Sequence, residues 1–84
     1  MTHAPDQEII DNLIPQEVVS RIVDGASPIR AWREYLQLTQ EDLANRLNIS
    51  QPAYAQQETV AKPRKATREN VAAAFGIKPN QLEL

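Results

Sequence analysis

Amide side chains gather on one short stretch of the chain, LNISQPAYAQQET at residues 47–59. If this stretch is a helix with Tyr54 as its one large inward anchor, its outward face offers Gln51, Ala53 and Gln56. A glutamine amide can hydrogen-bond bidentately with the edge of an adenine, and an alanine methyl group can contact that of a thymine. The residue types therefore suit the recognition of bases in a DNA groove.

Glutamine is also a good former of solvated helices, so the amides alone are consistent with a helix face that is exposed to water and binds nothing. The flanking residues favour the functional interpretation. Polar side chains that suit contact with phosphate stand at helix N-termini, and a basic run with no acid among its members follows at residues 62–68. The predicted phosphate contacts are Thr39, Gln40, Ser50, Lys62, Arg64 and Lys65.

Length and composition exclude several other kinds of protein. A chain of 84 residues makes one small domain with a modest core. It has no cysteine for disulfides or thiolate metal sites, and the single His3 cannot build a metal site by itself. We therefore expect no enzyme activity, cofactor or metal. No apolar run reaches the roughly 18 residues of a membrane span, which predicts a soluble, cytoplasmic protein.

Charge is unevenly distributed along the chain. Residues 1–26 hold five acidic residues and one arginine, a net charge of −4, whereas residues 27–84 hold eight basic and six acidic residues, a net charge of +2. The overall charge of −2 argues against simple bulk attraction to nucleic acid. The sequence predicts an acidic N-terminal arm and helix at residues 1–26, joined to a mildly basic domain at residues 27–84.

Residues that start and stop helices divide the chain into short helical segments with little sign of strands. Ser27, Thr39, Ser50 and Thr67 suit N-cap positions, because a side-chain oxygen there accepts from a free backbone N–H. Asn48 tolerates the left-handed backbone of a tight turn. The expected helices are residues 15–24, 28–37, 40–47, 51–58 and 68–75, followed by a short turn that begins at Pro79.

Apolar residues at helical spacing give each helix an inward side. In the first helix this side is predicted to hold four aliphatic residues, which the chain's own second helix, a second copy or another protein must cover. The residues expected on these apolar sides are Val18, Val19, Ile22, Val23, Ile29, Trp32, Leu36, Leu43, Ala44, Leu47, Ile49, Tyr54, Val71, Ala72, Phe75 and Leu82.

Residues 29–82 resemble the Cro/repressor (Xre-type) helix-turn-helix DNA-binding family. The resemblance is carried by Arg33, the runs LTQEDLA at residues 38–44 and LNIS at residues 47–50, Glu58, and VAAAFGI at residues 71–77. It implies a compact all-α, five-helix domain, here with an N-terminal helical extension. It also implies an inward ion pair between Arg33 and Glu58, and base contacts from the helix at residues 51–58.

The lead-in at residues 14–35 resembles that of antitoxins which carry an Xre-type domain and are encoded beside RelE/ParE-like toxins. Those toxins are small basic proteins, so an acidic arm would offer complementary charge. Apolar residues of the arm and first helix are the predicted partner contacts. They are Ile9, Ile10, Leu13, Ile14, Val18, Val19 and Ile22.

Three functions remain open on the sequence. The first is a repressor that is also an antitoxin, regulating its own operon and neutralising a toxin. The second is a stand-alone phage-like or chromosomal repressor without a toxin, and the third is an interaction module that does not bind DNA. For the repressors we expect a palindromic double-stranded operator bound by a homodimer, because paired half-sites mirror a two-fold protein.

Overall fold

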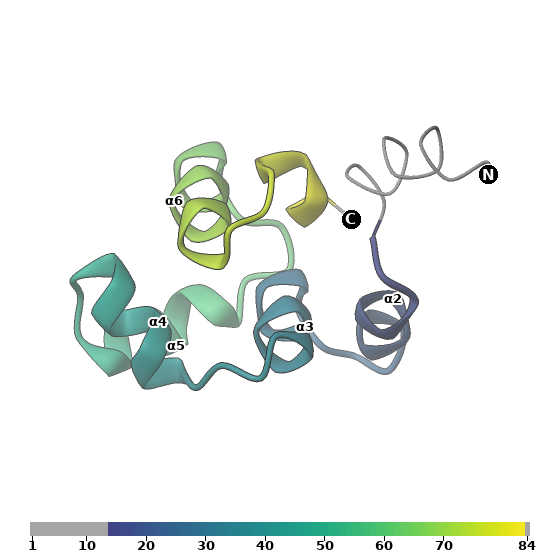
Figure 1. Ribbon diagram of the computed structural model, residues 1–84, viewed down its shortest axis with the longest axis horizontal. Helices are drawn as coiled ribbons and strands as arrows, with labels where there is room; N and C mark the ends of the chain where they lie inside the picture. Colours follow the sequence, from purple (N-terminus) through teal and green to yellow (C-terminus); the bar gives the residue numbers. More distant parts are fainter. Residues whose placement is uncertain (1–13, 84) are drawn as a thin grey trace, which may run out of the picture.

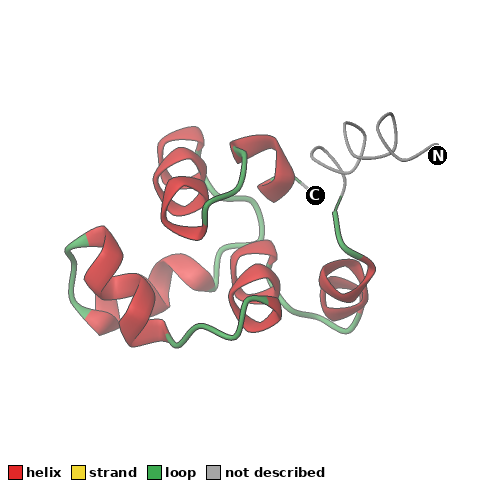
Figure 2. Ribbon diagram, viewed as in Figure 1, coloured by secondary structure: helices red, strands yellow, loops and turns green. Residues whose placement is uncertain are grey.

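The computed structural model describes residues 14–83, and within them the chain forms five α-helices and a final 3₁₀ turn with no strand (Figures 1 and 2). The expected all-α class is therefore confirmed for this part of the chain. No helix in it is long and apolar enough to cross a membrane. The elements are α2 (Gln16–Val23), α3 (Pro28–Tyr35), α4 (Gln40–Leu47), α5 (Gln51–Glu58), α6 (Lys65–Phe75) and η1 (Pro79–Leu82).

Local side-chain chemistry fixes the α4–α5 hairpin as the sequence predicts. The Thr39 hydroxyl accepts from the N–H of Asp42 at 3.0 Å, and the Asp42 carboxylate accepts from the N–H of Thr39 at 2.9 Å. Asn48 ends α4 in the left-handed conformation, with φ 58°. Two residues later, Ser50 caps α5 by accepting from the N–H of Ala53 at 3.3 Å. Two eight-residue helices thus meet across a three-residue turn.

Helix α3 ends at Tyr35, two residues earlier than predicted, because Gln37 adopts a left-handed conformation with φ 61°. This turn lets the N–H of Leu38 bond to the carbonyl oxygen of Arg33 at 3.0 Å, which closes the end of the helix. The same turn directs the Leu38 carbonyl toward the Arg33 guanidinium, whose Nη1 donates to it at 2.8 Å. The early end of α3 therefore helps to position the Arg33 guanidinium.

Helix α6 begins at Lys65, so the prediction that Thr67 caps this helix is wrong. Its N-cap residue is Arg64, whose side chain makes no capping hydrogen bond. The backbone starts the helix instead, through a 2.8 Å bond from the N–H of Arg68 to the Arg64 carbonyl. The guanidinium of Arg68 also donates to the Pro63 carbonyl at 2.7 Å, which ties the preceding loop to the helix.

The core lies around α3, which contacts α2, α5 and α6 (Figure 1). Trp32 is an internal residue, 3% exposed, and its indole N–H donates to the Gln81 carbonyl of η1 at 2.9 Å. The expected inward residues of α4, α5 and α6 belong to the same core cluster or pack against it. The buried apolar residues are Val18, Ile29, Ala31, Trp32, Leu43, Ala44, Tyr54, Val71, Ala72, Phe75 and Leu82.

Only one edge of the predicted apolar side of α2 is buried. Val18 is fully buried in the core and Ile22 packs against it, whereas Val19 is 41% and Val23 is 79% exposed. The chain's own helices therefore cover Val18 and Ile22 of the four aliphatic residues, and they leave Val19 and Val23 exposed. Val19 follows Val18 and Val23 follows Ile22, so each exposed valine is rotated by about 100° around the helix axis from an inward residue. Among the described elements, α3 is the main neighbour of α2.

The left-handed Gln37 gives a direct test of the turn between α3 and α4. We expect Gln37→Gly to raise the free energy of unfolding by about 0.5 to 1 kcal/mol, because glycine adopts a positive φ without steric cost. Chemical denaturation measures the change. As a control, Ala73→Gly at an exposed position inside α6 should lower stability by about 1 kcal/mol. A destabilised Gln37→Gly would contradict the described turn.

Candidate nucleic-acid interface

A buried carboxylate joins the end of α5 to α3. Glu58 is 4% exposed and forms a bidentate ion pair with Arg33, at 2.5 Å from Arg33 Nε to Oε2 and 3.2 Å from Nη2 to Oε1. The Tyr54 hydroxyl donates to Oε2 at 2.7 Å. The Ser27 hydroxyl donates to the backbone carbonyl of the same glutamate. The first residue before α3 and the last residue of α5 are thereby held together.

Gln40 extends this cluster to the surface. Its Nε2 donates to Glu58 Oε1 at 2.9 Å, so each carboxylate oxygen accepts two hydrogen bonds. On its other side, Gln40 Oε1 accepts from Nε2 of Gln51 at 2.6 Å. Gln40 and Gln51 are the first residues of α4 and α5, and the side chain of Gln51 is exposed. A continuous chain of side chains thus runs from the core to the outer end of α5.

The same contacts set the charge states of the cluster. Burial raises the pKa of Glu58, but hydrogen bonds from Arg33, Gln40 and Tyr54 outweigh this effect and hold that pKa below its usual value. The hydrogen bond with Glu58 raises the pKa of the Arg33 guanidinium. Burial, followed by the bond to Glu58, raises the pKa of the Tyr54 phenol. The pair is therefore ionised at neutral pH.

The predicted readout residues share the outward face of α5. Gln51, Pro52, Ala53 and Gln56 are all exposed, while Tyr54 is fully buried on the opposite side. No exposed residue of this helix is charged. The face thus offers amides, a methyl group and a proline ring at the surface.

Two of the predicted phosphate contacts, Thr39 and Ser50, stand beside this face, and each keeps an unused hydrogen-bond donor. Thr39 and Ser50 are exposed, and each uses its side-chain oxygen as an acceptor for a helix N–H. A hydroxyl that accepts a capping bond still has its O–H, so it can donate to a phosphate oxygen. Both hydroxyls can therefore serve the cap and an anionic ligand together.

Gln40, a further predicted phosphate contact, also forms hydrogen bonds within the chain. Its amide oxygen and one of its amide hydrogens are engaged with Gln51 and Glu58, and it is only half-exposed. Sequence reasoning missed this role because the bonds join side chains 18 and 11 residues apart, on the two helices α4 and α5. A pattern of residues close together in the sequence does not predict such a contact.

The predicted cationic contacts lie in the loop between α5 and α6 and at the start of α6. The side chains of Lys62, Arg64 and Lys65 are exposed and form no hydrogen bond or ion pair within residues 14–83. By contrast, Arg21 and Arg30 both pair with Glu34, at 3.3 and 2.8 Å. Three unpaired positive charges are thus available to an anionic partner near the end of α5.

The predicted partner contacts of the N-terminal part have different fates. Ile9, Ile10 and Leu13 lie outside the described residues. Ile14 and Ile22 are half-buried, and Val19 is exposed. Assigning Val18 to a partner is a mistake, because its side chain is fully buried in this chain's own core.

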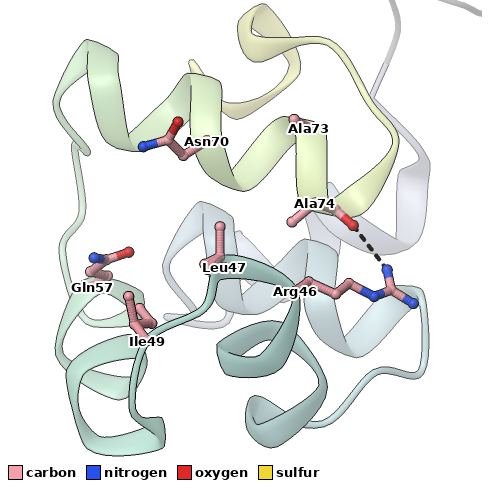
Figure 3. A pocket seen from close by; sticks show the side chains of 7 residues that line it. All are labelled: Arg46, Leu47, Ile49, Gln57, Asn70, Ala73 and Ala74. Atoms are coloured by element: carbon pink, nitrogen blue, oxygen red, sulfur yellow. Dashed lines mark hydrogen bonds between the residues drawn. The ribbon is translucent and has the colours of Figure 1, made fainter.

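A separate groove lies between the α4–α5 hairpin and α6 (Figure 3). It has a volume of about 500 Å³, and the Arg46 guanidinium at one end donates to the Ala74 carbonyl at 2.9 Å. It shares no lining residue with the exposed amide face of α5. The lining residues are Arg46, Leu47, Ile49, Gln57, Asn70, Ala73 and Ala74.

Comparison with known proteins adds no assignment: the chain matches no family model, no curated protein and no solved structure.

The lowered pKa of Glu58 predicts how stability depends on pH. Because the folded-state pKa lies below the unfolded value of 4.5, the ionised carboxylate stabilises the fold fully above that pH. This stabilisation is lost as the pH falls through the folded-state pKa. We expect the free energy of unfolding, measured by denaturation at a series of pH values, to decline below pH 4.5. The decline should be shallower in Glu58→Gln, and an equally steep decline in that variant would contradict the assignment.

Proposed function

We propose that this chain is a sequence-specific DNA-binding repressor of the helix-turn-helix type. Helix α5 enters the major groove, where Gln51, Ala53 and Gln56 contact base edges. Helix α4 crosses above it, and the hydroxyl groups of Thr39 and Ser50 contact phosphates. This assignment also rests on the resemblance of residues 29–82 to Cro/repressor domains.

The observation that carries the proposal is the uncharged amide face of α5 beside unpaired cations. Eight residues at 1.5 Å per residue make a helix about 12 Å long, and the major groove is about 12 Å wide. A merely solvated helix would need no support, yet Gln51 is held by Gln40 and, through it, by the buried Glu58. Such preorganisation suits a side chain that must meet a ligand in a fixed orientation.

The cations supply affinity without sequence preference. Lys62, Arg64 and Lys65 follow α5 in the chain, where the loop would run along the DNA backbone. Neutralising phosphates releases condensed counterions, so binding should weaken steeply as the salt concentration rises. With a chain of net charge −2, this local cluster rather than the overall charge provides the attraction.

A selection from random DNA tests the proposal. The full chain is mixed with duplexes that contain a randomised segment, and bound duplexes are recovered and sequenced over several rounds. We expect one enriched palindrome with half-sites about 10 base pairs apart from centre to centre, bound by two copies of the chain. Failure to enrich any sequence, with equal affinity for all duplexes, would contradict a sequence-specific repressor.

We further propose that the repressor is an antitoxin, with α2 as part of the surface that binds a small basic toxin. The observation that favours this function is the exposure of Val19 and Val23, one helical turn apart, within the segment of net charge −4. Exposed apolar side chains in a segment whose sequence is acidic suit a basic protein with an apolar groove. In a stand-alone repressor, the alternative cover for this surface would be a second copy of the chain.

Co-expression tests this second function. We expect a RelE/ParE-like toxin encoded beside this gene to be neutralised by the full chain. Val19→Asp together with Val23→Asp should abolish neutralisation while leaving DNA binding unchanged, since neither residue is buried in the core. A chain that binds its operator but neutralises no adjacent toxin would be the stand-alone repressor.

A further inference from the structure

Arg68, in the first turn of α6, has a buried hydrogen-bond donor without an acceptor. Its Nη1 donates to the Pro63 carbonyl at 2.7 Å, but its Nε has no hydrogen-bond partner within residues 14–83. No other buried side-chain nitrogen or oxygen of these residues lacks a partner. Oε2 of Glu83 lies 3.6 Å from Nε, which is too long for a hydrogen bond. An unpaired buried donor is unfavourable, so this position favours a closer acceptor.

Arg33 shows which acceptor fits the same edge of a guanidinium. Its Nε and Nη2 meet the two carboxylate oxygens of Glu58, at 2.5 and 3.2 Å. This planar fork of donors matches the two oxygens of a carboxylate. In Arg68 the Pro63 carbonyl engages Nη1 only, so Nε and Nη2 remain for a contact of the same kind. The unused edge of Arg68 is thus suited to a carboxylate.

Arg68 lines a pocket of about 220 Å³ between the α5–α6 loop, residues 59–64, and the end of η1. Two of the lining residues, Pro63 and Leu82, are buried and apolar. Lys62 also lines the pocket, and its side chain forms no hydrogen bond or ion pair within residues 14–83. The volume lies below the roughly 300 to 1,000 Å³ that is typical for drug-sized ligands. Size, charge and walls together suit a small anion with a short apolar part.

Glu83 is the acidic residue that lines this pocket, and its side chain is loosely held. The side chain is 54% exposed, and the 3.6 Å approach to Arg68 is its one polar contact within residues 14–83. Exposed ion pairs add little to stability because water still solvates both charges. Glu83 is also tethered to the backbone, whereas a ligand can align both of its oxygens with the fork. A carboxylate from a ligand can therefore displace that of Glu83.

We propose that this pocket binds a short-chain aliphatic carboxylate. The two oxygens of the anion accept from Nε and Nη2 of Arg68, Lys62 contributes a second positive charge, and the alkyl group packs against Pro63 and Leu82. The inference goes beyond the proposed repressor function and does not depend on it. Because Lys62 is also a proposed contact for the DNA backbone, the anion and DNA would compete for that cation.

A titration of the full chain, without DNA, tests the proposal. The labelled protein receives sodium isobutyrate while sodium chloride keeps the ionic strength constant, and NMR spectra follow the Arg68 Nε–H and the Leu82 methyl groups. We expect both sets of signals to shift and saturate with one common dissociation constant. Acetate lacks two carbon atoms of isobutyrate, so it should bind about fourfold or more weakly, because it buries less apolar surface.

Three variants assign the binding to this pocket. Arg68→Lys keeps the positive charge but loses the fork, so isobutyrate should bind about fivefold or more weakly. Glu83→Gln removes the competing carboxylate, so the affinity should rise about threefold. The matched control is Arg46→Lys, at an arginine that lines the separate groove beside α6, and it should bind as the wild type does.

Several results would overturn the inference. One is a wild-type chain whose Arg68 and Leu82 signals do not shift, or shift without saturating. Another is an Arg68→Lys chain that binds isobutyrate as tightly as the wild type. Where Arg68→Lys does not fold, an affinity that stays unchanged in Glu83→Gln is the result that overturns it. A chain that binds isobutyrate but selects no DNA sequence would support the pocket while contradicting the proposed repressor.

Discussion

Arg33→Ala is expected to lower the free energy of unfolding by about 3 to 5 kcal/mol, the largest effect of any change considered for this chain. The substitution leaves the Glu58 carboxylate, 4% exposed, without its charged partner. It also leaves the Leu38 carbonyl without the 2.8 Å bond from Arg33 Nη1. The bonds from Gln40 and Tyr54 remain, but neither donor carries a charge. Urea denaturation at pH 7 measures the loss.

The matched control changes both partners. Arg33→Met with Glu58→Leu removes the two charges together, so no ion stays buried alone, and we expect a smaller loss than for Arg33→Met by itself. An ion pair that contributed nothing would make the two changes additive. Additive losses would therefore show that Arg33 and Glu58 are not coupled, against the geometry described for them.

The second large effect concerns DNA affinity. Gln51→Ala or Gln56→Ala should weaken binding to the selected operator by about 1 to 3 kcal/mol and relax the preference at one base position. Lys62→Ala should weaken binding to all duplexes about equally and lower the slope of log affinity against log salt by about one. Fluorescence anisotropy over a range of salt concentrations measures both.

Gln16→Ala serves as the control for this series, because Gln16 is exposed on α2, away from the amide face. It should leave affinity, preference and salt slope unchanged. If Gln51→Ala and Gln56→Ala behaved like Gln16→Ala, the outward face of α5 would not be reading bases. If these two substitutions lowered affinity equally for all duplexes, Gln51 and Gln56 would contact the DNA backbone rather than the bases.

The sequence predicts those parts of the fold that local chemistry decides. The Thr39 and Ser50 caps and the left-handed Asn48 each depend on neighbours within a few residues, and all three occur as expected. The start of α6 was missed because Arg64 initiates it through backbone bonds alone, without a capping side chain to signal it. Thr67 has the side-chain oxygen that a cap requires, yet it lies inside α6 rather than at its N-cap position.

Tertiary contacts decide the remainder. The exposure of Val23 could not be predicted because it depends on which neighbours α2 has, and periodicity gives only a helix's apolar side. The same holds for the bonds of Gln40, since they join α4 to α5 through side chains that approach one another only in the folded chain. The outward direction of Gln51 and Gln56, by contrast, follows from the inward Tyr54 and was predictable.

In the proposed complex, the exposed face of α5 lies in the major groove of DNA. The most direct measurement is an NMR spectrum of the ¹⁵N,¹³C-labelled chain bound to its selected duplex. We expect intermolecular nuclear Overhauser effects from the Ala53 methyl group and the Gln56 amide to major-groove protons of the bases. Intermolecular signals confined to α2, or to the groove that contains Ile49 and Ala73, with none from α5, would contradict the claim.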